Sequence, residues 1–245
     1  MNDKALIQNI SKHFKSRSAV STKELFDYIK SKEPKSPDNT ISWKIYLLKE
    51  AGKLIHISRG LYSFDDKGAF HPPISPLLKK LHNRIKKELP YLNFCLWDTR
   101  WLNGFMIHQI NRFYIVIEAE KDGVESVFHR LSEDYKNVFL NPDKKTLERY
   151  GSNFNESIIV KPLISEAPII RADNIETISI EKLLVDCIVD VDLFAAQQDE
   201  LEYIYRTAFE KYNVNINKAK RYARRRDHLE EFEIMLKKNY QTVAK

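Results

Sequence analysis

The sequence predicts an α+β protein, in which a small helical domain with a β-hairpin precedes an α/β domain with C-terminal helices. Three amphipathic patterns and a glycine turn fill residues 1–70, apolar runs alternate with helical patterns from residue 91, and helical patterns dominate after residue 180. Prolines at positions 72, 73 and 76 interrupt these patterns. We therefore expect a first domain over residues 1–70, a linker and basic helix over residues 71–90, and a second domain over residues 91–245.

Two apolar stripes with helical spacing open the chain. The first stripe consists of Leu6, Ile7, Ile10 and Phe14. Ser21 and Glu24 then have the spacing of a capping box, in which each side chain satisfies a free backbone N–H of the first turn. The helix that they open buries a second stripe, Leu25, Tyr28 and Ile29, and ends near Pro34.

A third helix is predicted to begin after Ser36, with Pro37 at its first position, and to end at Gly52. Its buried stripe consists of Ile41, Ile45, Leu47, Leu48 and Ala51. Two β-prone runs, residues 54–58 and 61–64, flank a glycine turn and predict a hairpin. Three helices and a hairpin within about 65 residues are typical of a winged helix-turn-helix.

The outward side of the third helix has the composition of a recognition helix. Its positions are polar, aromatic or basic: Asn39, Thr40, Ser42, Trp43, Lys44 and Tyr46. Such side chains bond base edges in the major groove and nearby phosphates, and Arg59 in the hairpin turn is placed to reach phosphate or the minor groove. Two alternatives stay open: winged helices also mediate protein contacts, and Trp43 or Tyr46 can instead be core residues. The charge favours DNA, because residues 1–90 hold 18 Lys and Arg against 9 Asp and Glu.

The middle of the chain predicts a sheet covered by helices. Strands are expected over residues 93–97, 113–119, 137–140 and 157–163; helices are expected over residues 77–89, 99–106 and 123–135, and from Asp143. Cys95 and Cys187 lie in apolar runs and lack the spacing of a metal or redox site. We therefore expect both cysteines to be buried free thiols.

The second domain has no recognisable active site, and we expect no catalytic residues, metal or cofactor. The candidates for a metal-dependent nuclease are Asp98, Glu118, Glu120 and Lys121. A nuclease strand carries Glu and Lys two positions apart, on one face, whereas Glu120 and Lys121 are adjacent and point to opposite faces. Gly151-Ser152 is not followed at short range by the Asp-x-Asp that a nucleotidyltransferase requires. We interpret these charges as solvated strand ends.

The C-terminal part is predicted to be helical. A helix over residues 180–188 has a continuous apolar face that must dock on the domain, and further helices follow over residues 201–212 and from Asn217. The last carries a basic patch: Lys218, Lys220, Arg221, Arg224, Arg225 and Arg226. Two interpretations stay open. The patch contacts a nucleic-acid backbone or an acidic partner, or it is a solvated face paired with Glu230, Glu231 and Glu233.

Three segments together resemble the AbiEi-type antitoxins of bacterial abortive-infection operons. They are residues 52–64 in the hairpin, residues 178–186 with the core Glu-Lys-Leu-Leu-Val-Asp, and the Tyr-Ala-Arg-Arg of residues 222–225. The resemblance implies a winged-helix repressor that binds inverted repeats in its own operator. It also implies a second domain, nucleotidyltransferase-like in shape but without the active residues, that counters a nucleotidyltransferase toxin, often without a stable complex.

Two classes of function therefore compete. The first is an antitoxin-like DNA-binding transcriptional regulator, and the second is a nucleic-acid enzyme, a restriction-like nuclease or nucleotidyltransferase, with the winged helix as its targeting module. The first residues lack the apolar stretch of a signal peptide, and no apolar run approaches the roughly 18 residues of a membrane span. We expect a cytoplasmic protein whose partners are double-stranded DNA and a cognate toxin, with no membrane contact.

Overall fold

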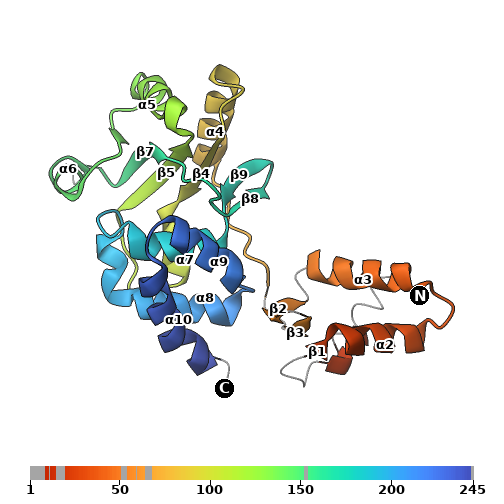
Figure 1. The fold of residues 1–245 in the computed structure, drawn as a ribbon. Coiled ribbons are helices and arrows are strands. Elements are labelled where there is room, and N and C mark those ends of the chain that lie inside the picture. Colours follow the sequence, from red (N-terminus) through yellow and green to blue (C-terminus); the bar gives the residue numbers. More distant parts are fainter. Residues whose placement is uncertain are drawn as a thin grey trace. The chain divides into compact units, whose positions relative to one another are not determined.

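The computed structural model has the mixed α+β class that the sequence predicts. It describes residues 9, 10, 12–14, 20–50, 54–58, 60–63, 68–151 and 154–243. The chain forms two compact units (Figure 1): unit 1 comprises Met1–Ala69 with Lys211–Asn215, and unit 2 comprises Phe70–Glu210 with Ile216–Lys245. The basic helix, predicted to lie with the linker over residues 71–90, belongs to unit 2.

Unit 1 combines helices with a small antiparallel sheet. Its elements are β1 (Val20–Ser21), α2 (Thr22–Lys32), α3 (Asp38–Glu50), β2 (Ile55–Ser58) and β3 (Leu61–Ser63). The strands lie in the order β1-β3-β2. Gly60 closes the hairpin with a φ of 76°, a left-handed conformation that glycine adopts without strain. The backbone N–H of Thr22 donates to the Gly60 carbonyl over 2.8 Å, which ties the start of α2 to this turn.

The local signals of unit 1 are confirmed with small shifts. Ser21 and Glu24 form the predicted capping box at the start of α2. The third helix begins at Asp38, so Pro37 precedes it, and the Pro37 carbonyl accepts from Thr40 and Ile41. The strand β1 was not predicted, because two residues are too few to show an alternating pattern.

The three apolar stripes of unit 1 meet in one core. Its buried members are Ile10, Phe14, Val20, Leu25, Ile29, Ile41, Ile45, Leu48, Leu54 and Tyr62. Tyr28 and Leu47, which were predicted to be buried, are half-buried. Leu6, Ile7, Ala51 and Gly52 lie outside the described residues. Because the stripe of α3 is buried, its opposite side is turned outward.

Unit 2 is built on a four-stranded sheet with the order β4-β5-β7-β6. The strands are β4 (Phe94–Asp98), β5 (Phe113–Ala119), β6 (Val138–Leu140) and β7 (Glu156–Pro162). β5, β7 and β6 are parallel, and β4 is antiparallel to β5. The helices around them are α4 (Pro76–Glu88), η1 (Thr99–Gly104), η2 (Lys121–Gly123), α5 (Val124–Ser132) and α6 (Lys144–Arg149). These elements confirm the predicted α/β alternation, although α5 and η1 are shorter than expected.

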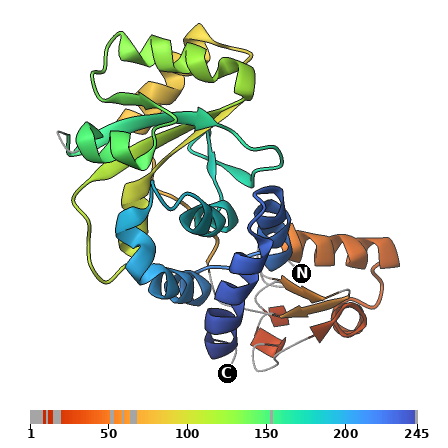
Figure 2. The ribbon, with the colours of Figure 1, turned by 60° about the vertical axis from the view of Figure 1, so that its left-hand side comes forward.

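The rest of unit 2 is a hairpin followed by helices. The hairpin β8 (Ile169–Ala172) and β9 (Ile175–Ile178) was not predicted. The helices are α7 (Ile180–Val189), η4 (Ala195–Glu200), α8 (Leu201–Lys211), α9 (Ile216–Arg225) and α10 (Leu229–Val243). α7 lies between the sheet and the C-terminal helices (Figure 2), and its first eight residues are all buried. The predicted docking of this helix on the domain is confirmed, but its burial is not limited to one apolar face, since its charged side chains Glu181, Lys182 and Asp186 are buried too.

Both cysteines are buried and free, as predicted, and burial raises the pKa of each thiol well above its usual value. Across the described part of the chain, no group of three or more His, Cys, Asp or Glu side chains could hold a metal ion. Within the same part, none of the helices combines the length and the apolar character that crossing a membrane requires.

Candidate functional site

The first candidate site is the outward face of α3. The predicted DNA-binding residues Asn39, Thr40 and Ser42 are exposed. Trp43 and Tyr46 are 57% and 46% exposed, and their rings stack with centroids 5.1 Å apart. Two large aromatic side chains left in solvent beside polar neighbours are typical of a binding surface. The interpretation of Trp43 and Tyr46 as core residues is wrong.

Lys44 does not belong to this open face. Its Nζ donates to Glu33 Oε2 over 2.7 Å, and both side chains are about 85% buried, with 15% and 14% exposed. The ion pair joins the residue after α2 to the middle of α3 and fixes the turn between the helices. The prediction that Lys44 contacts DNA is corrected on this ground, because its ammonium is engaged inside unit 1. The other predicted cation, Arg59, lies outside the described residues.

Lys44→Ala should lower the free energy of unfolding of unit 1 by at most about 1 kcal/mol, since partly screened ion pairs contribute little to stability. The hydrogen bond from Lys44 lowers the pKa of Glu33 below its usual 4.5. The contribution is therefore fully present above pH 4.5 and is lost as pH falls through the lowered pKa. Hydrogen exchange of the α2 and α3 amides measures it. Lys30→Ala, which removes the more exposed pair with Asp38, is the control, and an equal effect of the two variants would contradict the assignment.

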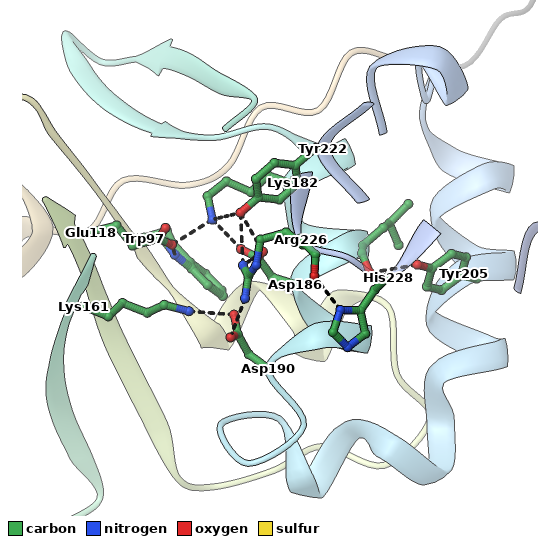
Figure 3. Close-up of polar contacts among 11 residues, drawn as sticks. Trp97, Glu118, Lys161, Lys182, Asp186, Asp190, Tyr205, Tyr222, Arg226 and His228 are labelled. Carbon is green, nitrogen blue, oxygen red and sulfur yellow. Dashed lines mark hydrogen bonds and ion pairs between the residues drawn. The ribbon is translucent and has the colours of Figure 1, made fainter. Parts of the chain in front are cut away.

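The second candidate site is a buried charge network in unit 2 that joins β5, β7, α7 and α9 (Figure 3). Its members are Glu118, Lys161, Lys182, Asp186, Asp190, Tyr222 and Arg226. Glu118 and Lys161 occupy partnered positions on the parallel strands β5 and β7, so both side chains point to the sheet face that α7 covers. The formal charges of its three carboxylates and three cations cancel.

Lys182 is the centre of the network and is fully buried. Its Nζ donates to Glu118 Oε1 over 2.8 Å, to Tyr222 Oη over 3.1 Å, and to Asp186 one helical turn further along α7. Trp97 Nε1 also donates to Glu118 Oε1, over 3.1 Å. All three protons of the ammonium are therefore used, as burial of a charge requires.

The outer half of the network extends toward solvent. Arg226 donates to Asp186 Oδ1 and Asp190 Oδ1, each over 2.8 Å, and Lys161 donates to Asp190 Oδ2 over 2.6 Å. Lys161 and Asp190 line a cavity of about 310 Å³ beyond the ends of β6 and β7, together with Asn141 and Asp192. The network therefore reaches from the middle of the sheet to an open cavity.

The network favours the charged forms of Glu118 and Lys182. Burial would raise the pKa of Glu118, but the charges of Lys182 and Lys161 outweigh it and lower that pKa. Burial would lower the pKa of Lys182, but Asp186 and Glu118 hold it well above its usual value. Burial raises the pKa of Asp186 although Lys182 opposes the change. A buried ammonium that stays protonated serves as a fixed positive charge and not as a general base.

Several predictions for unit 2 are corrected by this geometry. Glu118 and Asp98 were interpreted as solvated strand ends, but both are buried. Asp98 bonds to Arg100, Glu120 accepts from Asn93, and Lys121 is exposed. The four nuclease candidates therefore do not share a site. The missed signal was the spacing of Lys182, Asp186 and Asp190, four residues apart in an apolar helix, because such charges are rarely buried unless they are paired.

The predicted basic patch is divided between several surroundings. Arg226 belongs to the buried charge network, Lys220 pairs with Glu233 over 2.7 Å, and Arg225 donates to Ser165 Oγ over 2.9 Å. Lys218 is half-buried, whereas Arg221 and Arg224 are exposed. α9 also has a neutral face, Ala219, Tyr222 and Ala223, which is buried. Arg221 and Arg224 are exposed, and both predicted contacts of the patch, with a nucleic-acid backbone or with an acidic partner, stay open for them.

Comparison with known families gives one match over most of the chain. Residues 40–242 match the sequence profile of a family described as a family of unknown function (DUF6577). The matched part runs from the first turn of α3 to the end of α10, and so includes the buried charge network. No curated protein matches the chain.

Proposed function

We propose that this chain, which belongs to DUF6577, a family of unknown function, is a transcriptional regulator that reads double-stranded operator DNA with α3. The observation that carries the proposal is the outward face of α3, where exposed Asn39, Thr40 and Ser42 adjoin the Trp43–Tyr46 stack. Amide and hydroxyl side chains bond base edges, and apolar groups contact the thymine methyl. The order of helix, turn, helix and antiparallel hairpin is compatible with a winged helix-turn-helix.

The charge of this region supports the proposal. Residues 1–90 carry twice as many Lys and Arg as Asp and Glu, 18 against 9. Lys and Arg side chains that contact phosphates attract DNA without regard to its sequence, and such contacts hold a recognition helix in register over the groove. Affinity for DNA should therefore fall as salt rises.

We further propose that the regulator is an antitoxin of the AbiEi type, which represses its own operon and counters a nucleotidyltransferase toxin without a stable complex. The support is the sequence resemblance. Two of the three segments that carry the resemblance, residues 178–186 and 222–225, contact each other, since Lys182 of the first donates to Tyr222 of the second. A nucleotidyltransferase-like shape for unit 2 is part of this proposal.

Gel shifts with the DNA upstream of the chain's own gene test the proposed function. We expect a retarded band that persists in the presence of unrelated competitor DNA. The affinity of the chain for the upstream DNA should fall about 10³-fold or more between 50 and 200 mM salt. Equal affinity for unrelated DNA of the same length would contradict operator recognition. In a parallel reaction, plasmid DNA incubated with the chain and Mg²⁺ should remain uncleaved. Cleavage would favour the competing hypothesis of a nuclease.

Growth rescue tests the antitoxin proposal separately. Co-expression of the chain with a nucleotidyltransferase toxin encoded beside it should restore growth. An Asn39→Ala/Trp43→Ala variant should restore growth equally, because α3 acts on DNA and not on the toxin. Failure of the unmodified chain to restore growth would remove the antitoxin proposal and leave DNA binding standing.

A further inference from the structure

A second cavity of unit 2 has the features of a ligand site. Its volume is about 420 Å³, within the range of about 300–1,000 Å³ that small-molecule sites occupy. It lies between the chain that enters β5, the helix α6 and the segment that follows α7. Ile110, Leu147 and Leu193 give it apolar walls. Such walls suit the flat faces of an aromatic heterocycle.

Gln197 in the wall of this cavity has an unsatisfied amide oxygen. The residue is 2% exposed, and its Oε1 accepts no hydrogen bond from any residue that the structure describes. Leaving a buried polar group unpaired is costly, so native proteins rarely keep one without a use for it. An amide supplies both a donor and an acceptor, the combination that matches the edge of a nucleobase.

The lining of the cavity also includes an exposed cation. Arg112 lines the cavity, is exposed, and forms no ion pair within the described residues. The other cation in the lining, Lys144, forms a long ion pair, with its Nζ 4.0 Å from Glu148 Oε1. A guanidinium binds phosphate through two parallel hydrogen bonds. The exposed carboxylate of Asp192, also in the lining, can accept hydrogen bonds from sugar hydroxyls.

We infer that this cavity binds a nucleoside phosphate, with the base between the apolar walls and against Gln197, and the phosphate on Arg112. The site is distinct from the outward face of α3 and does not depend on the proposed DNA binding. Two sources share this chemistry, a free nucleotide and the end of a single-stranded nucleic acid.

Isothermal titration of the full chain with AMP, GMP, CMP and UMP tests the inference, with inorganic phosphate and a single-stranded RNA trinucleotide as further probes. We expect saturable binding of at least one monophosphate or of the trinucleotide, tighter than that of phosphate. Tighter binding of the trinucleotide than of every monophosphate identifies a nucleic-acid end as the ligand, and the reverse identifies a free nucleotide.

Variants separate a site from nonspecific attraction. Arg112→Ala and Gln197→Leu should each weaken binding about tenfold, the usual effect of losing one charge-assisted or one buried hydrogen bond. Gln197→Leu should melt at the same or a higher temperature, because it removes an unpaired polar group. Arg171→Ala, an exposed arginine on β8, is the control and should bind as the unmodified chain does. Absence of binding by all probes, or binding by Arg112→Ala and Gln197→Leu that is as tight as binding by the unmodified chain, would overturn the inference.

Discussion

Lys182→Met is expected to lower the free energy of unfolding of unit 2 by about 3–5 kcal/mol, the usual cost of removing one partner from a buried ion pair. Methionine has a similar volume, so packing changes little. The loss comes from Glu118 and Asp186, whose carboxylates stay buried near each other without the ammonium that bonds to both. Urea unfolding, followed by the fluorescence of buried Trp97 and Trp101, measures the change.

A charge-balanced variant distinguishes electrostatics from packing. Glu118→Gln/Lys182→Met removes one charge of each sign and leaves Asp186 with Arg226, which bonds to it over 2.8 Å. It should recover more than half of the stability that Lys182→Met loses. Lys238→Met, which removes a surface pair with Glu202, is the matched control and should cost about 1 kcal/mol or less. If Lys182→Met costs no more than Lys238→Met, the network does not hold unit 2 together.

The Asn39→Ala/Trp43→Ala variant should lose about 2–4 kcal/mol of affinity for operator DNA, or roughly 30- to 1,000-fold in Kd. Asn39 offers an amide to a base edge, and Trp43 offers an apolar surface beside it. Both side chains are exposed, so the stability of unit 1 should change little. Gel shifts or fluorescence anisotropy at fixed salt measure the loss.

The salt dependence of the same variant tests how α3 contributes. Contacts to bases leave the slope of log K against log salt unchanged, whereas each lost phosphate contact reduces the slope by about one. We expect the variant to keep the slope of the unmodified chain. Asn83→Ala/Tyr203→Ala changes the same kinds of side chain on α4 and α8 of unit 2, and should bind normally. Normal binding by Asn39→Ala/Trp43→Ala would exclude α3 as the reading helix.

The sequence by itself determined the local elements of this protein. The capping box of Ser21 and Glu24, the apolar stripe of α3, the hairpin around Gly60 and the strands of the main sheet were all predictable. Their signals are helical or alternating periodicity, caps and turns, which involve residues close together in the chain. Shorter elements such as β1 escaped, because they span less than one period of any pattern.

Only the tertiary structure decided which charged residues are exposed and which are buried. Lys44 and Arg226 look like free cations in the sequence, and Glu118 looks like a solvated strand end. Their partners lie on other elements: Glu33 follows α2, and Lys182 and Asp186 lie on α7. Burial of a charge is tolerated only where a partner compensates for lost hydration. The spacing of Lys182, Asp186 and Asp190 indicates that these charges are paired, but β5, α7 and α9 are far apart along the chain, so no local pattern could identify the partners on the other elements.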